Sequence, residues 1–146
     1  MGIPVRRHQA ASFGPLTLHN PGSRPAILEA VHLLDVDPGL DVIDVMVVEP
    51  DGTAPLVAVD VGFPPQKPGG TMYPVAGYTL APAQSPEQFV QILVGATITR
   101  RGMVGARRMA VDYRIGRMRY RAVYRYSIWL CAERDVPEPG CGAPDL

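Results

Sequence analysis

The alternation of apolar and polar residues is clearest in the last long run of the chain, from residue 111 to residue 131. Gly116 and Arg117 suit a two-residue type II′ turn, because that turn takes glycine at its first central position, where φ is positive. A hairpin closed by this turn places Ile115 opposite Met118, and the pairing then continues residue by residue away from the turn. The sequence therefore predicts a β-hairpin with one apolar face and one arginine-rich face.

The two faces of this hairpin differ in chemistry. The apolar face is expected to pack in the core and carries Val111, Tyr113, Ile115, Met118, Tyr120, Ala122, Tyr124, Tyr126, Ile128 and Leu130. The opposite face, called the arginine face below, carries Arg114, Arg119, Arg121 and Arg125. Asp112 stands opposite Arg121, as in a cross-strand ion pair. A slip of one residue would bury the arginines, so the register is strongly specified.

Shorter runs between turn signals predict further strands. We expect them at residues 16–18, 26–34, 40–48, 56–61 and 89–99. Residues 62–79 are rich in proline and glycine, which is typical either of a functional loop or of an irregular crossover between two sheets, with a short strand near residues 72–75. Residues 103–105 are expected to form a flexible tip before the hairpin. Helix content should be low, and the pattern as a whole predicts an all-β fold, an immunoglobulin-like antiparallel β-sandwich of about seven strands.

The length of 146 residues fits a single domain. We expect an N-terminal extension over residues 1–15, the β-sandwich domain over 16–131 and a C-terminal tail over 132–146. Cys131 and Cys141 lie close together at this end, and a disulfide between them would tie the tail back to the sheet and stabilise the fold by about 2–3 kcal/mol. The alternative is a pair of unrelated thiols in a reducing compartment.

The charges are unevenly placed although the formal net charge is zero. Residues 25–62 contain eight acidic residues and no lysine or arginine, whereas residues 100–125 contain nine arginines and one aspartate. One interpretation is two differently charged edges of one sandwich that partly neutralise each other. The other is a dipolar molecule that docks head to tail, or one that meets an acidic partner through the arginine face.

Nucleic acid is not the partner that this composition favours. Such binding calls for a net positive surface interleaved with exposed aromatic side chains. Here the tyrosines of the hairpin fall on the face opposite the arginines. The chain has one lysine beside thirteen arginines, which indicates a GC-rich genome and weakens the case that each arginine was selected for recognition.

No pattern of catalytic, cofactor-binding or metal-binding residues is found. The chain lacks a G-x-S-x-G nucleophile turn and a P-loop. The histidines, which are scattered, are His8, His19 and His32. The sequence therefore predicts no enzyme, no cofactor and no resident metal. One acidic cluster allows two interpretations, a calcium site at a sandwich end or solvated turn residues, and it consists of Asp35, Asp37, Asp41 and Asp44.

Three segments carry a resemblance to a known group of proteins. Residues 18–27, LHNPGSRPAI, look like the opening of bacterial immunoglobulin-like domains, and residues 78–84, YTLAPAQ, look like the turn that precedes a later strand of such domains. The ending, with V-x-Y-R-I-G, then Y-R and a strand reaching Cys131, resembles uncharacterised actinobacterial extracytoplasmic domains. The resemblance implies a fold and a location, and it carries no catalytic residues.

These observations favour a non-catalytic interaction or assembly domain of a bacterial envelope or secreted protein. Its partner would be another protein or a further copy of the chain. The alternatives are an intracellular or particle-associated assembly protein and a β-sandwich that binds a small molecule or an ion. The N-terminal residues lack the apolar core of a signal peptide and no run is long enough to span a membrane. We therefore expect an extracytoplasmic location if the chain is the exported part of a longer protein, and a cytoplasmic one otherwise.

Overall fold

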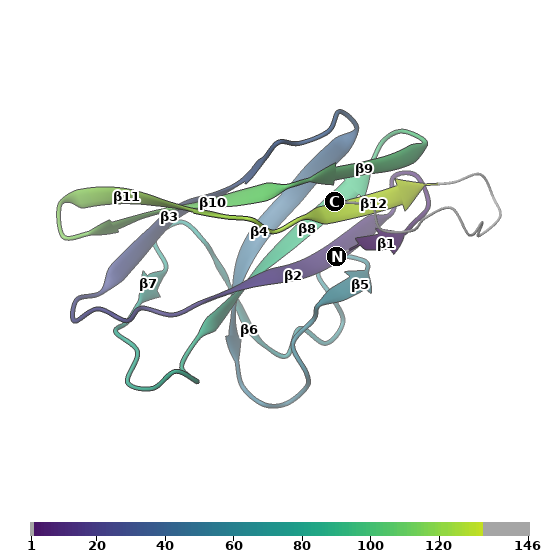
Figure 1. Cartoon of the computed structure of the whole chain (residues 1–146). Helices are drawn as coiled ribbons and strands as arrows, with labels where there is room; N and C mark the ends of the chain where they lie inside the picture. The colour runs from purple at the N-terminus through teal and green to yellow at the C-terminus, as the bar shows by residue number, and fades with distance from the viewer. Residues whose placement is uncertain (1, 133–146) are drawn as a thin grey trace.

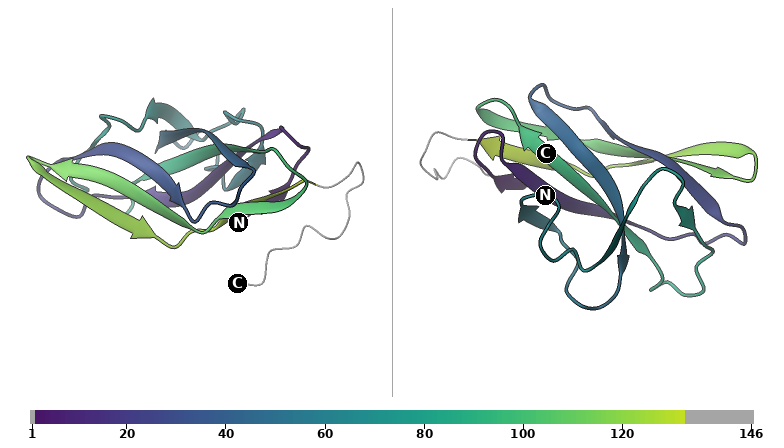
Figure 2. Two further views of the ribbon diagram at one scale, coloured as in Figure 1. Left: turned by 90° about the horizontal axis from the view of Figure 1, so that it is seen from above. Right: turned by 180° about the vertical axis from the view of Figure 1, so that it is seen from behind.

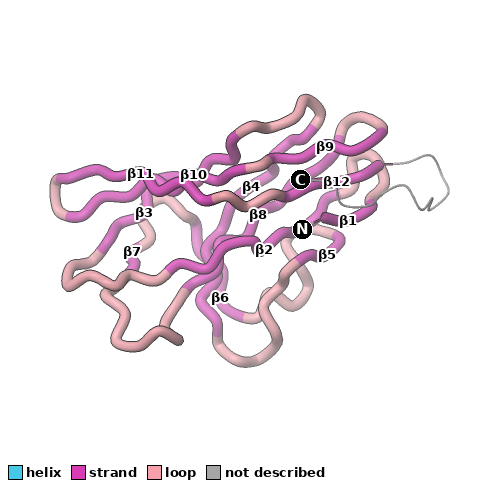
Figure 3. The backbone as a smooth tube through the Cα atoms, viewed as in Figure 1, coloured by secondary structure: helices cyan, strands magenta, loops and turns pink. Residues whose placement is uncertain are grey.

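The computed structural model describes residues 2–132, and all regular secondary structure in that range is β-strand (Figure 3). The all-β prediction is confirmed, but the strands outnumber the seven expected. They are β1 (Gly2–Pro4), β2 (Ala10–Leu18), β3 (Ala26–Leu34), β4 (Leu40–Pro50), β5 (Val59–Val61), β6 (Gly70–Pro74), β7 (Thr79–Leu80), β8 (Val90–Ile98), β9 (Gly102–Ala106), β10 (Arg108–Ile115), β11 (Met118–Tyr124) and β12 (Ile128–Ala132).

The strands form three sheets arranged in two layers (Figures 1 and 2). One layer is the five-stranded sheet β5-β2-β8-β4-β6. The other layer joins the sheet β11-β10-β3-β7 to the sheet β1-β12-β9, because β9 runs on into β10 and β11 runs on into β12. The core lies between the layers, with Phe13 and Ile92 contributed by the first layer and Val104, Met109 and Leu130 by the second.

The central strand β8 is buried on both faces. Ile92, Val94 and other alternate side chains enter the core cluster. On the opposite face, the side-chain amide of Gln91 donates a hydrogen bond to the carbonyl of Val57 at 2.6 Å, and the Phe63 ring packs over Gly95. The segment that precedes β6 therefore covers the outside of this sheet. The short strand expected near residues 72–75 is present as β6.

The predicted hairpin is confirmed in register. Ile115 pairs with Met118, and Asp112 lies opposite Arg121. Gly116 has a φ of 59°, the positive value that the first central position of a type II′ turn requires. The second strand is interrupted, however: β11 ends at Tyr124, and β12 begins after three intervening residues, in a different sheet.

Three other expectations are corrected by the structure. Most of the predicted N-terminal extension belongs to β1 and β2, and Phe13 within it is fully buried. The predicted flexible tip at residues 103–105 lies in β9, where Val104 is fully buried. The strand predicted over residues 56–61 is confined to its last three residues, β5.

Candidate docking surface

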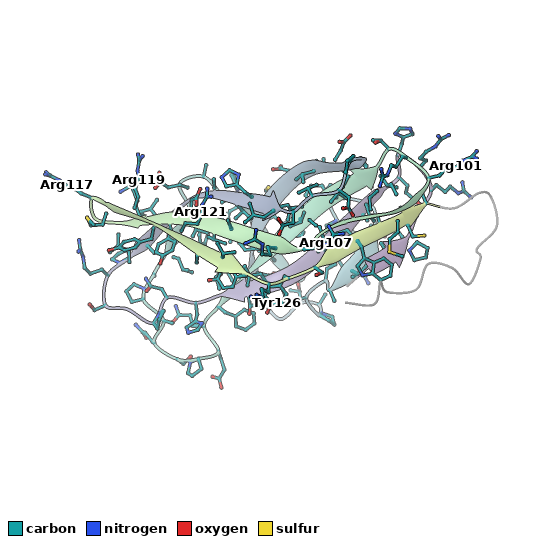
Figure 4. All side chains as sticks on the ribbon, turned by 45° about the horizontal axis from the view of Figure 1, so that its top comes forward. Arg101, Arg107, Arg117, Arg119, Arg121 and Tyr126 are labelled. Atoms are coloured by element: carbon teal, nitrogen blue, oxygen red, sulfur yellow. The ribbon has the colours of Figure 1, made fainter. Side chains whose placement is uncertain are left out.

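The arginine face follows the β10–β11 hairpin from its turn inward. Figure 4 shows Arg117, Arg119 and Arg121 one after another along the hairpin, with Arg101 at the far end of the molecule. The four predicted members of the face are all exposed: Arg114, Arg119, Arg121 and Arg125. The hairpin brings the first three together because their positions in β10 and β11 share one side of the ladder, whereas Arg125 follows the end of β11.

Arg121 is held by the carboxylate directly across the ladder. Its Nε and Nη2 atoms donate to the two Asp112 oxygens at 2.6 and 3.0 Å, which is the bidentate geometry of a strong charge-assisted pair. His32, from the neighbouring strand β3, places its Nε2 atom 3.2 Å from the same carboxylate. The hydrogen bond from Arg121 lowers the pKa of Asp112, and the same contact raises the pKa of Arg121. The predicted ion pair is confirmed.

The remaining arginines are less constrained. The Nε atom of Arg119 lies 3.6 Å from a Glu29 oxygen, and the side chain of Arg119 is 81% exposed. Arg114 donates to the carbonyl of Gly116 at 3.4 Å, within its own turn. Arg125 forms no ion pair with any residue of the described range. The face therefore keeps an excess of positive charge, although Glu29 and Asp112 offset part of it.

The apolar face of the hairpin is buried at one end only. Val111 is 1% exposed and belongs to the core cluster. Near the turn, Met118 is 62% exposed and Tyr120 is 44% exposed, with the Tyr120 ring stacked on Tyr113 at a centroid distance of 5.4 Å. Tyr126 is 43% exposed as well. The prediction that this whole face is core was wrong, because the hairpin reaches past the opposing sheet to the margin of the molecule (Figures 1 and 2).

The hairpin also ends its sheet. β11 is the edge strand of the order β11-β10-β3-β7. Strand β1 covers the corresponding side of β12 but pairs only with residues 129–131. Within the described range, β11 therefore has a strand partner on one side alone. Such an edge carries backbone N–H and C=O groups that another strand can pair with.

A second group of charges lies where β3 leads into β4 and β9 into β10. Arg108 donates to Asp35, with its Nε atom 2.5 Å from the nearer carboxylate oxygen, and Arg107 donates to Asp37 at 3.0 Å. The N–H of Gly105 also donates to Asp37, at 3.0 Å. In each pair the arginine hydrogen bond is the main cause that lowers the pKa of the carboxyl group. These contacts confirm the interpretation that the acidic and basic segments partly neutralise each other.

Sequence reasoning missed these two pairs. Arg107 and Arg108 were counted among the nine arginines of the basic segment, but nothing local to the sequence placed them beside Asp35 and Asp37. The only signal was the complementary charge of the two segments. The pairing also bears on the calcium interpretation, because two of the four carboxylates in that cluster are engaged by arginine. Within residues 2–132, no group of three or more metal-ligating side chains lies close enough to hold an ion.

The predicted disulfide lies partly outside the described residues. Cys131 is a buried residue of β12, whereas Cys141 falls beyond residue 132. The pairing of the two cysteines stays a prediction, as does the tail that it would tie back.

Two comparisons with known proteins found no match for this chain. No protein-family model matches it, and no curated protein sequence matches it significantly. A search of the described residues for a long apolar helix found none that would cross a membrane.

Proposed function

We propose that this protein is a non-catalytic, immunoglobulin-like interaction domain of a bacterial envelope or secreted protein, and that it docks on a protein partner through the β10–β11 hairpin. The observation that carries the proposal is the combination of three features on one exposed strand. β11 has surplus positive charge on one face, exposed Met118 and Tyr120 on the other, and an unpaired edge within the described range.

The order of the strands supports the immunoglobulin-like part of the proposal. In the constant-type domain, the second, fifth and fourth strands are neighbours in one sheet, and the third, sixth and seventh are neighbours in the other. Taking β9–β10 and β11–β12 as single interrupted strands, the corresponding neighbours here are β2-β8-β4 and β3-β10-β11. One departure is that β1 pairs in parallel with β12, on the other layer from β2. β5, β6 and β7 are short additions at the sheet edges.

The chemistry of the hairpin supports a protein partner. Exposed tyrosine, methionine and arginine are enriched at the centres of protein interfaces. Within the described residues, Arg119 is held by one long ion pair, so its charge is available to an acidic partner at little cost. Arg121 keeps its bidentate contact with Asp112, so it contributes a fixed positive field rather than a free donor.

The compartment rests on the cysteines and on the resemblance to extracytoplasmic domains. Thiol counting under denaturing, non-reducing conditions, on protein recovered from its native compartment, separates export from an intracellular or particle-associated role. No reactive thiol is expected for an exported protein, because its two cysteines would form the disulfide. Two reactive thiols would support the intracellular alternative.

The docking role is tested by site-specific photo-crosslinking in cells that produce the protein. A photoreactive residue at Met118 should give a discrete crosslinked species, and the added substitution Arg119→Glu should reduce its yield by about tenfold. The same photoreactive residue at exposed Glu87, far from the hairpin in sequence, is the matched control. Failure of Met118 to give a product above that control would overturn the docking role.

A further inference from the structure

The first half of β4 offers a second unpaired edge. Residues 40–48 of β4 pair with β8 on one side, but β6 pairs on the other side with residues 46–50 only. Among residues 2–132, residues 40–45 therefore have no strand partner on that side. The N–H of Val45 is hydrogen-bonded to the carboxylate of Asp44 at 2.8 Å, as expected where no neighbouring strand supplies a carbonyl.

This edge is acidic and apolar at once. Asp41 and Asp44 are exposed, and between them Val42 and Ile43 are 44% and 49% exposed. In a sheet with one face packed on the core and one face in solvent, exposed and buried residues alternate along a strand. Four consecutive exposed residues, two of them β-branched and apolar, are therefore unusual. We call residues 40–45 of β4 the acidic edge.

A β-bulge gives the two carboxylates of the acidic edge a particular spacing. The register of β4 against β8 shifts between Val42 and Asp44, so that Asp41 lies opposite Thr97 and Asp44 opposite Gly95. Thr97 and Gly95 are two residues apart in β8, and they point to the same face of the sheet. Asp41 and Asp44 therefore share that face, with the spacing of alternate residues in a regular strand.

Strand β11 has the complementary pattern. Arg119 and Arg121 are alternate residues on one face, and Met118 and Tyr120 are exposed on the other. If β11 of one molecule lies along the acidic edge of another, the arginines fall beside the two carboxylates. The exposed apolar side chains, Val42 among them, then share the opposite face of the extended sheet.

From this match we infer that the partner of the hairpin is a second copy of this chain, which adds β11 to the acidic edge of its neighbour. This assembly rests on the docking role proposed above and identifies the partner of the hairpin as a second copy of the chain. The contact is heterologous: each molecule has one arginine-bearing strand and one acidic edge, so copies join head to tail into rings or filaments.

Two other pairings are disfavoured by charge and length. Two β11 strands placed side by side would bring Arg119 and Arg121 against the same residues of the second copy, which is repulsive. Strand β5 also ends its sheet and carries Asp60, but it is three residues long and offers one carboxylate. The acidic edge is the longer partner and the one with two matched charges.

A mixing experiment with two variants tests this geometry. Arg119→Glu/Arg121→Glu removes the basic strand, and Asp41→Arg/Asp44→Arg removes the acidic edge. We expect the mass of the wild type in solution to rise with concentration above the monomer value of 15.8 kDa, and we expect each variant alone to associate at least about tenfold more weakly. Mixed in equal amounts, the variants present one intact basic strand and one intact acidic edge. The reversed β11 of the first variant and the reversed edge of the second are also oppositely charged, so the mixture should recover association, with the two variants alternating in the assembly.

Charge-matched controls use residues outside the two strands. Arg6→Glu/Arg7→Glu and Asp60→Arg/Glu87→Arg change the net charge equally and should associate as the wild type does. The single reversals Arg119→Glu and Asp41→Arg replace the double variants if those do not fold, since Asp41 has no ion pair in the described range and Arg119 has one long one.

A wild type that stays monomeric up to millimolar concentration would overturn the head-to-tail assembly. So would a mixture that associates no more strongly than either variant alone, or an association that only the arginine variant abolishes. The docking role of the hairpin is tested independently by the crosslinking experiment, and it is refuted if Met118 gives no crosslink above its control. A crosslink at Met118 to a protein other than this chain, with a monomeric wild type, would leave the docking role standing and remove the second copy as occupant.

Discussion

The ion pair between Arg121 and Asp112 should stabilise the hairpin measurably, and a double-mutant cycle can isolate its contribution. The substitutions are Asp112→Asn, Arg121→Gln and both together. The side chains are 25% and 53% exposed, so the pair lies between a surface pair, worth about 0.2–1 kcal/mol, and a shielded charged hydrogen bond, worth about 1.5–3 kcal/mol. The bidentate contact favours a coupling free energy of about 1 kcal/mol. For a chain of this size, such a loss lowers the melting temperature by roughly 2–4 °C.

The assay is chemical denaturation of the four proteins at several pH values. Because Arg121 lowers the pKa of Asp112, the stabilisation is complete above the unfolded-state value of about 3.9, and it is lost as the pH falls through the lower folded-state value. The coupling should therefore be constant near neutral pH and shrink in acid below about pH 4. A coupling near zero at neutral pH, or one that grows on acidification, would refute the assignment.

Four further substitutions test the exposed end of the hairpin, a partly buried hydrogen bond and the turn. In thermal denaturation, Val111→Ala should cost about 1–3 kcal/mol and Met118→Ala should be nearly neutral, because only the first side chain is buried. Tyr78→Phe removes a hydrogen bond of 2.5 Å to Glu49 and should lower the free energy of unfolding by about 1–2 kcal/mol. Burial, and then Glu49, raise the pKa of Tyr78 in the folded protein. The difference in stability between wild type and variant should therefore shrink above about pH 10, as measured by denaturant titration. Gly116→Ala should lower the free energy of unfolding by about 1–2 kcal/mol in a denaturant titration, because residue 116 has a φ of 59°. Equal stability of variant and wild type would contradict the turn.

Local patterns predict the hairpin and most of the long strands. The turn at Gly116 and the alternation around it fix the register of β10 and β11, because a two-residue loop leaves only one pairing. Runs of β-branched residues likewise locate β4 and β8. These elements depend on neighbours in the sequence, and the sequence therefore suffices for them.

The elements that were missed depend on distant partners. β1 is three residues long and exists by parallel pairing with β12, at the other end of the described chain. β9 has the sequence GMVGA, whose small residues give little strand signal, and Gly105 lies against Trp129 of β12. The exposure of Met118 and Tyr120 follows from how far the hairpin reaches past the opposing sheet, which no local alternation reports.

The candidate surface was predicted in part for the same reason. Arg114, Arg119, Arg121 and the partner Asp112 follow from hairpin register, and they lie where expected. The contact of Arg119 with Glu29 could not be predicted, because it depends on where strand β3 lies relative to the hairpin. The acidic edge could not be predicted from the sequence. It depends on the bulge in β4 and on how few residues of β4 pair with β6, and local sequence patterns reveal neither.

The most direct test of the account is amide hydrogen exchange measured at low and high protein concentration. Pairing of β11 with the acidic edge would protect backbone N–H groups that are otherwise open to solvent. We predict that exchange in Met118–Tyr124 and in residues 40–45 is slower at high protein concentration than at low concentration. Exchange in β6 should not depend on concentration. In the Arg119→Glu variant, exchange in the two segments should not depend on concentration either. Exchange that is independent of concentration in β11 and in the acidic edge would contradict the account.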